Sequence, residues 1–234
     1  MPEITLWFLQ ASRSIRTAWL LEELGLDYTL KFSERMNQKA PPDFKAESNN
    51  PLGKFPTIQD GSLTVYESGA INEYVVLSEK KACSLTNGSY LCETYDKEGK
   101  LLPRDPKARV KVRQWIHAAE ATFALHALPI LYVRWNIPQD APEGILEETE
   151  KGVSVNVQND FHWLETELSL SQGRFLCGDH VTAADIMMQF SVDFIVARDL
   201  GTQGKEYPNV NRWLEDCMNT ESYKRAVEKT GHNM

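Results

Sequence analysis

Short runs of alternating apolar and polar residues dominate the first third of the chain and predict β-strands. Residues 3–9 and 27–32 alternate in this way, so each is predicted to form a strand. Between them, residues 15–24 carry apolar side chains at helical spacing, and Gly25 stands where a glycine commonly ends a helix. A strand, a helix and a second strand in this order predict a parallel pair joined by a right-handed crossover.

A hairpin and a helix are predicted to follow. Residues 33–49 are polar and are predicted to hold one short irregular helix. Residues 57–59 and 63–65 are predicted to pair around the turn signal Asp60-Gly61. A further helix is predicted from Ser68, which gives the element order β-α-β-α-β-β-α of a thioredoxin-like domain.

From about residue 101 the apolar period changes to 3.6, which predicts helices only. Pro129 is expected to kink or end the first long helix. Thr182 and Asp185 have capping-box form at the start of the third helix, and residues 222–230 predict a short last helix. The apolar positions that define the first three helices are Val112, Trp115, Ile116, Ala119, Phe123, Val157, Phe161, Leu164, Leu168, Ile186, Met187, Phe190, Phe194 and Ala197.

These patterns predict two domains of different class. Residues 1–79 are assigned to a thioredoxin-like α/β domain and residues 102–234 to an all-helical domain. Residues 80–101 are polar and are predicted to form an inserted linker, either a loop or a hairpin.

The inserted segment contains two of the four cysteines. If Asn87-Gly88 forms a two-residue turn, Cys83 and Cys92 face each other in a non-hydrogen-bonded pair, with Cα atoms about 4.5 Å apart. That separation permits a disulfide. The alternative is two free surface thiols in a loop, which a reducing compartment favours.

Composition and charge exclude several classes of protein. The 234 residues have a formal net charge of −8, so the basic stripe of a nucleic-acid-binding protein is not expected. No apolar run approaches the roughly 18 residues of a membrane span, and the N-terminus does not resemble a signal peptide. Four cysteines with no metal-ligand spacing favour a cytoplasmic protein without a metal.

The richest chemistry lies between Asn50 and Ile71. Phe55-Pro56 opens the first strand of the predicted hairpin, and Glu67-Ser68 follows its second strand and begins a helix. A hydroxyl and a helix N-terminus therefore lie together at a strand end. Such an end offers free N–H groups and a positive dipole to an anion such as a carboxylate. An ordinary hairpin followed by a capped helix gives the same pattern.

Phe55-Pro56 followed by Glu67-Ser68 resembles the glutathione site of the glutathione transferases. The resemblance implies a cis proline at position 56 and a Phe55 backbone that pairs with the cysteinyl part of glutathione. It also implies that Glu67 holds the γ-glutamyl ammonium and Ser68 the carboxylate. Lys54 is a candidate for the glycyl carboxylate, although a solvated loop lysine is an equal reading, and Lys39 is a weaker candidate.

Glutathione reacts as a thiolate, so its thiol pKa of about 8.5 must fall by roughly two units. The junction from Ala11 to Arg16 offers Ser12, Ser14 and a helix N-terminus for this task. Ser12 is the first candidate for the catalytic hydroxyl, Ser14 the second, and a backbone N–H the third. Either serine also suits a plain helix cap. No cysteine occurs in this stretch, which speaks against chemistry through a mixed disulfide.

The stretch from Ser12 to Leu26 resembles the serine-type, yeast-like glutathione transferases of fungi and bacteria. The likeness extends to residues 40–45 and 213–229. It implies a homodimeric detoxification enzyme that conjugates glutathione to electrophilic, partly apolar acceptors, with the reduction of organic hydroperoxides as a second activity. The alternative is a non-catalytic glutathione-binding or regulatory protein of the same fold. Four aromatic residues are candidates for an acceptor wall, although core positions are the commoner role: Trp7, Phe123, Tyr132 and Trp135.

Overall fold

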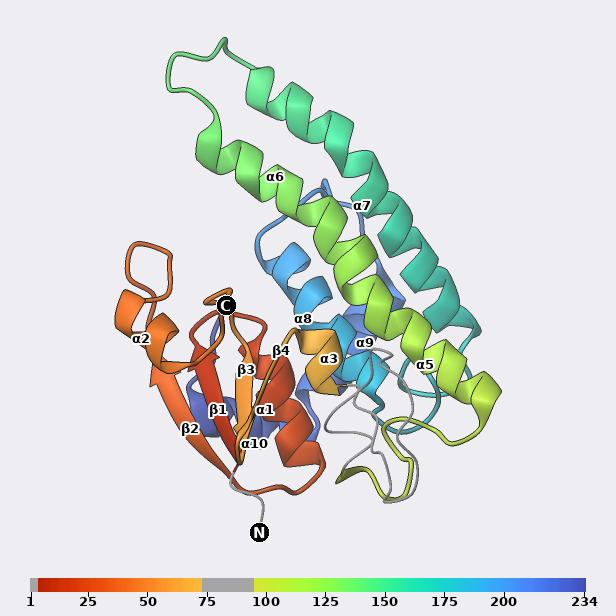
Figure 1. Ribbon diagram of the computed structural model, residues 1–234. Helices are drawn as coiled ribbons and strands as arrows, with labels where there is room; N and C mark the ends of the chain where they lie inside the picture. Colours follow the sequence, from red (N-terminus) through yellow and green to blue (C-terminus); the bar gives the residue numbers. More distant parts are fainter. Residues whose placement is uncertain (1–3, 73–94) are drawn as a thin grey trace. The chain divides into compact units, whose positions relative to one another are not determined.

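A computed structural model describes residues 4–72 and 95–234 (Figure 1). The proposed pairing of Cys83 with Cys92 and the domain boundary at residue 79 lie outside the described residues. Contacts divide the chain into two compact units, Met1–Arg109 with Met218–Met234, and Val110–Cys217.

The first unit contains a four-stranded sheet in the order β2-β1-β3-β4. The central strand β1 (Ile4–Leu9) pairs parallel with β2 (Tyr28–Ser33) and antiparallel with β3 (Thr57–Asp60). The strand β4 (Leu63–Tyr66) pairs antiparallel with β3. The parallel pair and the hairpin confirm the thioredoxin-like prediction, and Leu6, Phe8 and Ile58 are fully buried.

Three helices join these strands in the predicted places. The helix α1 (Ser14–Glu23) connects the parallel strands, and Gly25 follows it with φ +63°, a left-handed conformation that suits glycine. The short helix α2 (Pro42–Glu47) lies in the polar segment, and α3 (Ser68–Asn72) begins at the predicted serine.

The turn of the hairpin differs from the prediction by one residue. Asp60 pairs with Leu63 as the last pair of the ladder, so the two loop residues are Gly61 and Ser62. Gly61 has φ +56°, which a two-residue hairpin turn requires at its first position. The glycine is thus the first loop residue, and Asp60 still belongs to the strand.

The C-terminal helix α10 (Glu221–Thr230) belongs to the first unit, although the sequence groups it with the helical domain. Trp19 of α1 is fully buried, and its Nε1 donates to the Ser222 hydroxyl at 2.9 Å. Its ring meets the Tyr223 ring edge-on at 5.1 Å between centroids. The two helices therefore share one apolar interface, and both lie on the same face of the sheet (Figure 1).

His232 follows α10, and we predict that it makes the protein sensitive to acid. Its ring is 8% exposed and meets the Phe8 ring at 6.1 Å, and burial lowers the pKa of His232 to about 4. The unfolded chain, with a histidine pKa of about 6.5, binds this proton first, so stability falls as the pH drops from about 6.5 to 4. The expected loss is about 3 kcal/mol.

Urea unfolding at pH 7 and pH 4.5 measures this effect. His232→Gln should lose less stability between the two pH values than the unsubstituted protein. His162→Gln, at an exposed position, is the control. An equal loss in the His232 variant would contradict the prediction.

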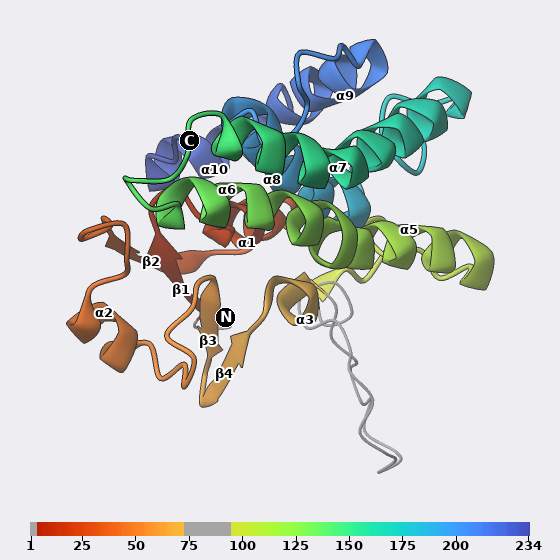
Figure 2. The same ribbon diagram turned by 90° about the horizontal axis from the view of Figure 1, so that it is seen from above.

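The second unit is helical throughout its secondary structure, as the 3.6 period predicts. In Figures 1 and 2, α6 and α7 run side by side. The sequence-predicted apolar faces are buried except at their last two positions, where Phe194 is half-buried and Ala197 is exposed. The rings of Phe123 and Phe161 lie 6.0 Å apart. The elements are α5 (Pro106–Ala118), the π-helical segment η1 (Ala119–Ala124), α6 (Leu125–Asn136), α7 (Ile145–Leu170), α8 (Ala183–Ala197) and α9 (Pro208–Met218).

Pro129 does not end its helix. The chain stays helical through Pro129 to Asn136, and the departure from α geometry lies earlier, in the π-helical residues 119–124. Within the described residues, the stretch 106–136 is long and apolar enough to meet a test for a membrane span, contrary to the sequence expectation. The buried apolar side chains of this stretch, among them Val112, Trp115 and Phe123, belong to the core of the unit, whereas Tyr132 and Trp135 are exposed.

The predicted capping box at the start of α8 is present and extends into a larger network. The Asp185 carboxylate is fully buried and accepts hydrogen bonds from the Thr182 N–H and hydroxyl, each at 2.9 Å. It also accepts from the Leu176 N–H and the Trp213 indole, each at 2.9 Å. One side chain thereby joins the loop before α8, the start of α8 and α9.

Candidate functional site

The sheet register brings the sequence-predicted site residues to one end of the sheet. Trp7 and Tyr66 flank Thr57 on its two sides. The chain before Thr57, which is Phe55-Pro56, therefore lies between the end of β1 and the end of β4. Glu67-Ser68 follows β4 at this same end, and the junction carrying Ser12 follows β1.

The peptide bond between Phe55 and Pro56 is cis, as the resemblance implies. The Phe55 side chain is 9% exposed and packs in a cluster with Trp7, Leu9 and Ala40. Its ring lies 4.8 Å from the ring of Phe44 on α2. This packing fixes the side chain inward, while no hydrogen bond from the described residues reaches the Phe55 backbone. A peptide strand can therefore add there.

Asn50 organises the loop that leads to this peptide, a role that the sequence does not reveal. Its Nδ2 donates to the Lys54 carbonyl at 2.8 Å and to Thr57 Oγ1 at 3.0 Å. Its Oδ1 accepts from the Leu52 N–H at 2.9 Å. An Asn followed by Pro is a turn signal, but the partners of its Nδ2, four and seven residues further along the chain, are set only by the folded loop.

Glu67 and Ser68 occupy contrasting positions at the end of β4. Glu67 is exposed and has φ +73°, an uncommon conformation for a residue other than glycine. Ser68 is 5% exposed and is the first residue of α3. Among the described residues, neither the Glu67 carboxylate nor the Ser68 hydroxyl has a hydrogen-bond partner. Both groups are thus available to a ligand, one as an anion and one as a donor.

The two predicted lysines are solvent-exposed. Lys54 contributes its carbonyl to the loop, accepting from Asn50 and from Thr57 Oγ1 at 3.0 Å. Lys39 pairs through its backbone with Met36. No ion pair joins either ammonium to another residue in the described part of the chain, so neither lysine side chain has a structural role there.

Ser12 and Ser14 form a closed hydrogen-bond ring with the last residue of β1. Ser12 Oγ donates to the Leu9 carbonyl at 2.6 Å, and the two hydroxyls lie 2.9 Å apart. The Leu9 N–H donates to Ser14 Oγ at 3.3 Å, and the Ser14 N–H donates to Ser12 Oγ at 3.1 Å. Ser12 is 6% exposed and Ser14 is fully buried.

The ring decides which proton each hydroxyl can offer. A serine hydroxyl has one proton to donate. Since the Ser12 proton goes to Leu9, the bond between the serines must be donated by Ser14. Both protons therefore point into the ring before any ligand binds, and Ser12 also accepts from the first N–H of α1, as a cap would. An activating role for Ser12 requires its proton to leave the Leu9 carbonyl.

Gln10 anchors this junction to the C-terminal segment, a contact that sequence reasoning missed. Its Nε2 donates to the Gly231 carbonyl at 2.8 Å, and its Oε1 accepts from the Ala11 N–H at 2.9 Å. These partners are 221 and 1 residues away along the chain. The separation of 221 residues explains why no local pattern pointed to the first contact.

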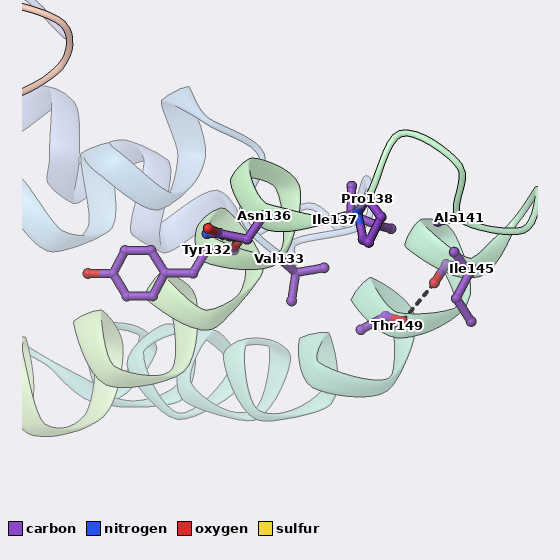
Figure 3. A pocket seen from close by; sticks show the side chains of 8 residues that line it. All are labelled: Tyr132, Val133, Asn136, Ile137, Pro138, Ala141, Ile145 and Thr149. Atoms are coloured by element: carbon purple, nitrogen blue, oxygen red, sulfur yellow. Dashed lines mark hydrogen bonds between the residues drawn. The ribbon is translucent and has the colours of Figure 1, made fainter.

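The four aromatic candidates for an acceptor wall fall into two pairs. Trp7 and Phe123 are core residues of their units, whereas Tyr132 and Trp135 on α6 are 51% and 53% exposed. A pocket of about 460 Å³ lies between the end of α6 and the start of α7 (Figure 3). Tyr132, Ile137 and Ile145 help to line it, and none of the predicted glutathione-site residues does.

Metal ligands do not cluster in the described structure. Across residues 4–72 and 95–234, no group of three or more His, Cys, Asp or Glu side chains is arranged to hold a metal ion.

Comparison with known proteins matches both parts of the chain to one family. The family model described as Glutathione S-transferase, N-terminal domain, matches residues 2–76. The model described as Glutathione S-transferase, C-terminal domain, matches residues 126–221. Together these ranges cover well over half of the chain.

Individual relatives agree with the family models. Glutathione S-transferase 3 of Schizosaccharomyces pombe is 28% identical over 98% of this chain and 89% of its own length. Glutathione S-transferase 1 of Saccharomyces cerevisiae is 24% identical over 98% of this chain and 96% of its own length. A glutathione S-transferase structure from Actinobacillus pleuropneumoniae has a TM-score of 0.74 at 28% identity, covering 98% of this chain and 94% of that one. The chain therefore belongs to the glutathione S-transferase family.

Proposed function

We propose that this protein transfers glutathione to electrophilic, partly apolar acceptors. In the reaction the glutathione thiolate forms a sulfur–carbon bond, the bond between carbon and leaving group breaks, and the thiol proton passes to solvent. Reduction of organic hydroperoxides by the same thiolate is a further reaction that we propose. Membership of a transferase family and the yeast relatives support the proposal.

One observation carries the assignment to glutathione. At one end of the sheet, the Phe55 backbone, the Glu67 carboxylate and the Ser68 hydroxyl have no hydrogen-bond partner among the described residues. They complement the cysteinyl backbone, the ammonium and the carboxylate of a γ-glutamyl peptide in turn. The Leu9 side chain packs in the same cluster as Phe55, so the serine ring lies next to this binding edge.

The activating step that we propose is an exchange of one hydrogen bond. Ser12 gives up a neutral bond to the Leu9 carbonyl, worth about 0.5–1.5 kcal/mol, for a bond to the thiolate, worth about 1.5–3 kcal/mol. The N-terminus of the ten-residue helix α1 adds about 0.3–1 kcal/mol. The sum of about 1–2 kcal/mol lowers the bound thiol pKa from about 8.5 to about 7–7.8. Ser14 supports the exchange, because it donates to Ser12 throughout.

A non-catalytic glutathione-binding protein is the second candidate function. The specific observation in its favour is that the Ser12 proton is already committed to the Leu9 carbonyl at 2.6 Å. A protein that kept this bond would bind glutathione as the thiol. Conjugation of a simple aryl halide distinguishes the two candidates, because only the enzyme accelerates it.

Glu67→Gln tests the binding site directly. The substitution preserves size and removes the charge that would meet the γ-glutamyl ammonium, so the dissociation constant of glutathione should rise about tenfold, or ~1.4 kcal/mol. Isothermal calorimetry gives the constant. Glu98→Gln, an exposed residue of the same unit, makes the same change in net charge and should bind as the unsubstituted protein does. An unchanged affinity in the Glu67 variant would argue against this site.

We further propose that the protein is a homodimer of the serine-type, yeast-like subgroup. The serines at positions 12 and 14 and the two yeast relatives support the subgroup, and the family resemblance supports the dimer.

A further inference from the structure

Arg35, in the loop after β2, ties the thiol-activating junction in place. Its Nε donates to the Gln10 carbonyl and its Nη2 to the Ala11 carbonyl, both at 2.9 Å. Its Nη1 donates to the Gln38 carbonyl at 3.0 Å. One planar guanidinium therefore joins the loop after β1 to the loop after β2. Two of its three acceptors are the residues directly before Ser12.

The Gln10–Ala11 segment that Arg35 bonds contains an unfavourable backbone conformation. Ala11 has φ +50°, which costs free energy for a residue with a Cβ and persists only where surrounding contacts fix it. The Ala11 N–H is bonded to the Gln10 side chain, which is itself anchored on Gly231. Arg35 binds the carbonyls of Gln10 and Ala11. The backbone before Ser12 is thus held through both its N–H and its carbonyl groups.

The positive charge of Arg35 also favours ionisation of a thiol bound near Ser12. Carbonyl oxygens near a thiolate would oppose its formation, and here the oxygens of Gln10 and Ala11 are bonded to a permanent cation. A fixed positive charge close to a thiol lowers the thiol pKa. The groups available to the peptide part of glutathione have no bond to Arg35 in the described structure.

We propose that Arg35 is a positioning residue for thiol activation, an inference that rests on the proposed function. It acts through the Gln10–Ala11 backbone on Ser12 rather than by holding glutathione. Its removal should therefore change the ionisation and reactivity of the bound thiol while leaving the affinity for glutathione nearly intact.

Arg35→Met and Arg35→Lys separate geometry from charge. Arg35→Met should raise the bound thiol pKa by about one unit and lower kcat at neutral pH about tenfold. Much of the lost rate should return at pH 9, where the thiol ionises unaided. Arg35→Lys keeps the positive charge but loses the planar guanidinium that bonds three carbonyls. The bound thiol pKa in this variant should therefore lie between those of the unsubstituted protein and Arg35→Met. The charged residues left unchanged in both variants include Arg13, Arg16, Lys54 and Glu67.

The dissociation constant of glutathione should change less than about threefold in both variants, a small change in free energy. Arg225→Met is the matched control, because Arg225 also bonds a backbone carbonyl of the first unit, that of Glu22 at 3.1 Å. It should leave the thiol pKa unchanged. If Arg35→Met destabilises the fold, the bound thiol pKa of Arg35→Lys decides the question. A raised pKa supports the role, and an unchanged pKa contradicts it.

An unchanged thiol pKa in the Arg35 variants, or weakened glutathione binding at constant kcat, would overturn this role. If the unsubstituted protein bound no glutathione, the proposed function itself would fail, which is a distinguishable result. If it bound glutathione and the Arg35 variants alone kept an unchanged thiol pKa, only the inference about Arg35 would fail.

Discussion

Replacing Asp185 by alanine is expected to lower the free energy of unfolding by about 4 kcal/mol or more. The buried carboxylate accepts four hydrogen bonds from three residues, Leu176, Thr182 and Trp213. Each donor left unsatisfied in the interior costs about 1–3 kcal/mol. The Thr182 hydroxyl can rotate to another acceptor, but the two backbone N–H groups and the indole cannot. The loss would also free the start of α8 from the loop before it.

Urea unfolding followed by circular dichroism measures this loss. Asp193→Ala is the matched control, because Asp193 lies on the same helix and accepts one long bond, from Gln189 at 3.4 Å. Asp193→Ala should lower the free energy of unfolding by less than about 1 kcal/mol. The loss of stability in Asp185→Asn should lie between those of Asp193→Ala and Asp185→Ala, because one side-chain oxygen remains as an acceptor. A loss below about 1 kcal/mol for Asp185→Ala would show that the network contributes little.

Replacing Ser12 by alanine is expected to lower kcat for aryl halide conjugation about tenfold at neutral pH. The variant cannot donate to the thiolate, so the net gain of the exchange with the Leu9 carbonyl is lost, and the bound thiol pKa should rise by about one unit. Affinity for glutathione should change little, because Phe55, Glu67 and Ser68 remain.

Ser14→Ala resolves the order of the serine ring. Ser14 donates to Ser12 but, in the proposed mechanism, not to the thiolate, so the effect on the thiol pKa should be smaller. Ser62→Ala, in the exposed hairpin turn, should have no effect. Unchanged kinetics in Ser12→Ala would move the activating role to Ser14 or to a backbone N–H.

Local pattern was sufficient for most of the fold because its elements are regular and continuous in sequence. The 3.6 period in α7 reflects a single buried face, whereas β1 is buried on both faces, with Leu6 and Phe8 on one and Trp7 and Leu9 on the other. Both elements lie where the pattern places them. The placement of α10 was not predictable in the same way. An amphipathic helix shows that it has a partner, but Trp19, which supplies its partner surface, lies about 200 residues earlier.

In the candidate site, too, the residues of local motifs were predictable and those with folded-state partners were not. Phe55-Pro56 and Glu67-Ser68 are dipeptides whose chemistry is visible in the sequence, and sheet register brings them to one end. Asn50 and Arg35 could not be identified, because their roles depend on backbone carbonyls that any residue could supply. The direction of the Ser12 hydroxyl was equally hidden, since it depends on a 2.6 Å contact with the Leu9 carbonyl.

The ultraviolet difference spectrum of bound glutathione tests the central claim most directly, because a thiolate absorbs where a thiol does not. The measurement is a pH titration of that band with saturating glutathione. The account predicts a band that is about half developed near pH 7–7.8, below the free thiol pKa of about 8.5. A bound thiol that titrates at 8.5 or above, or a protein that binds no glutathione, would contradict it.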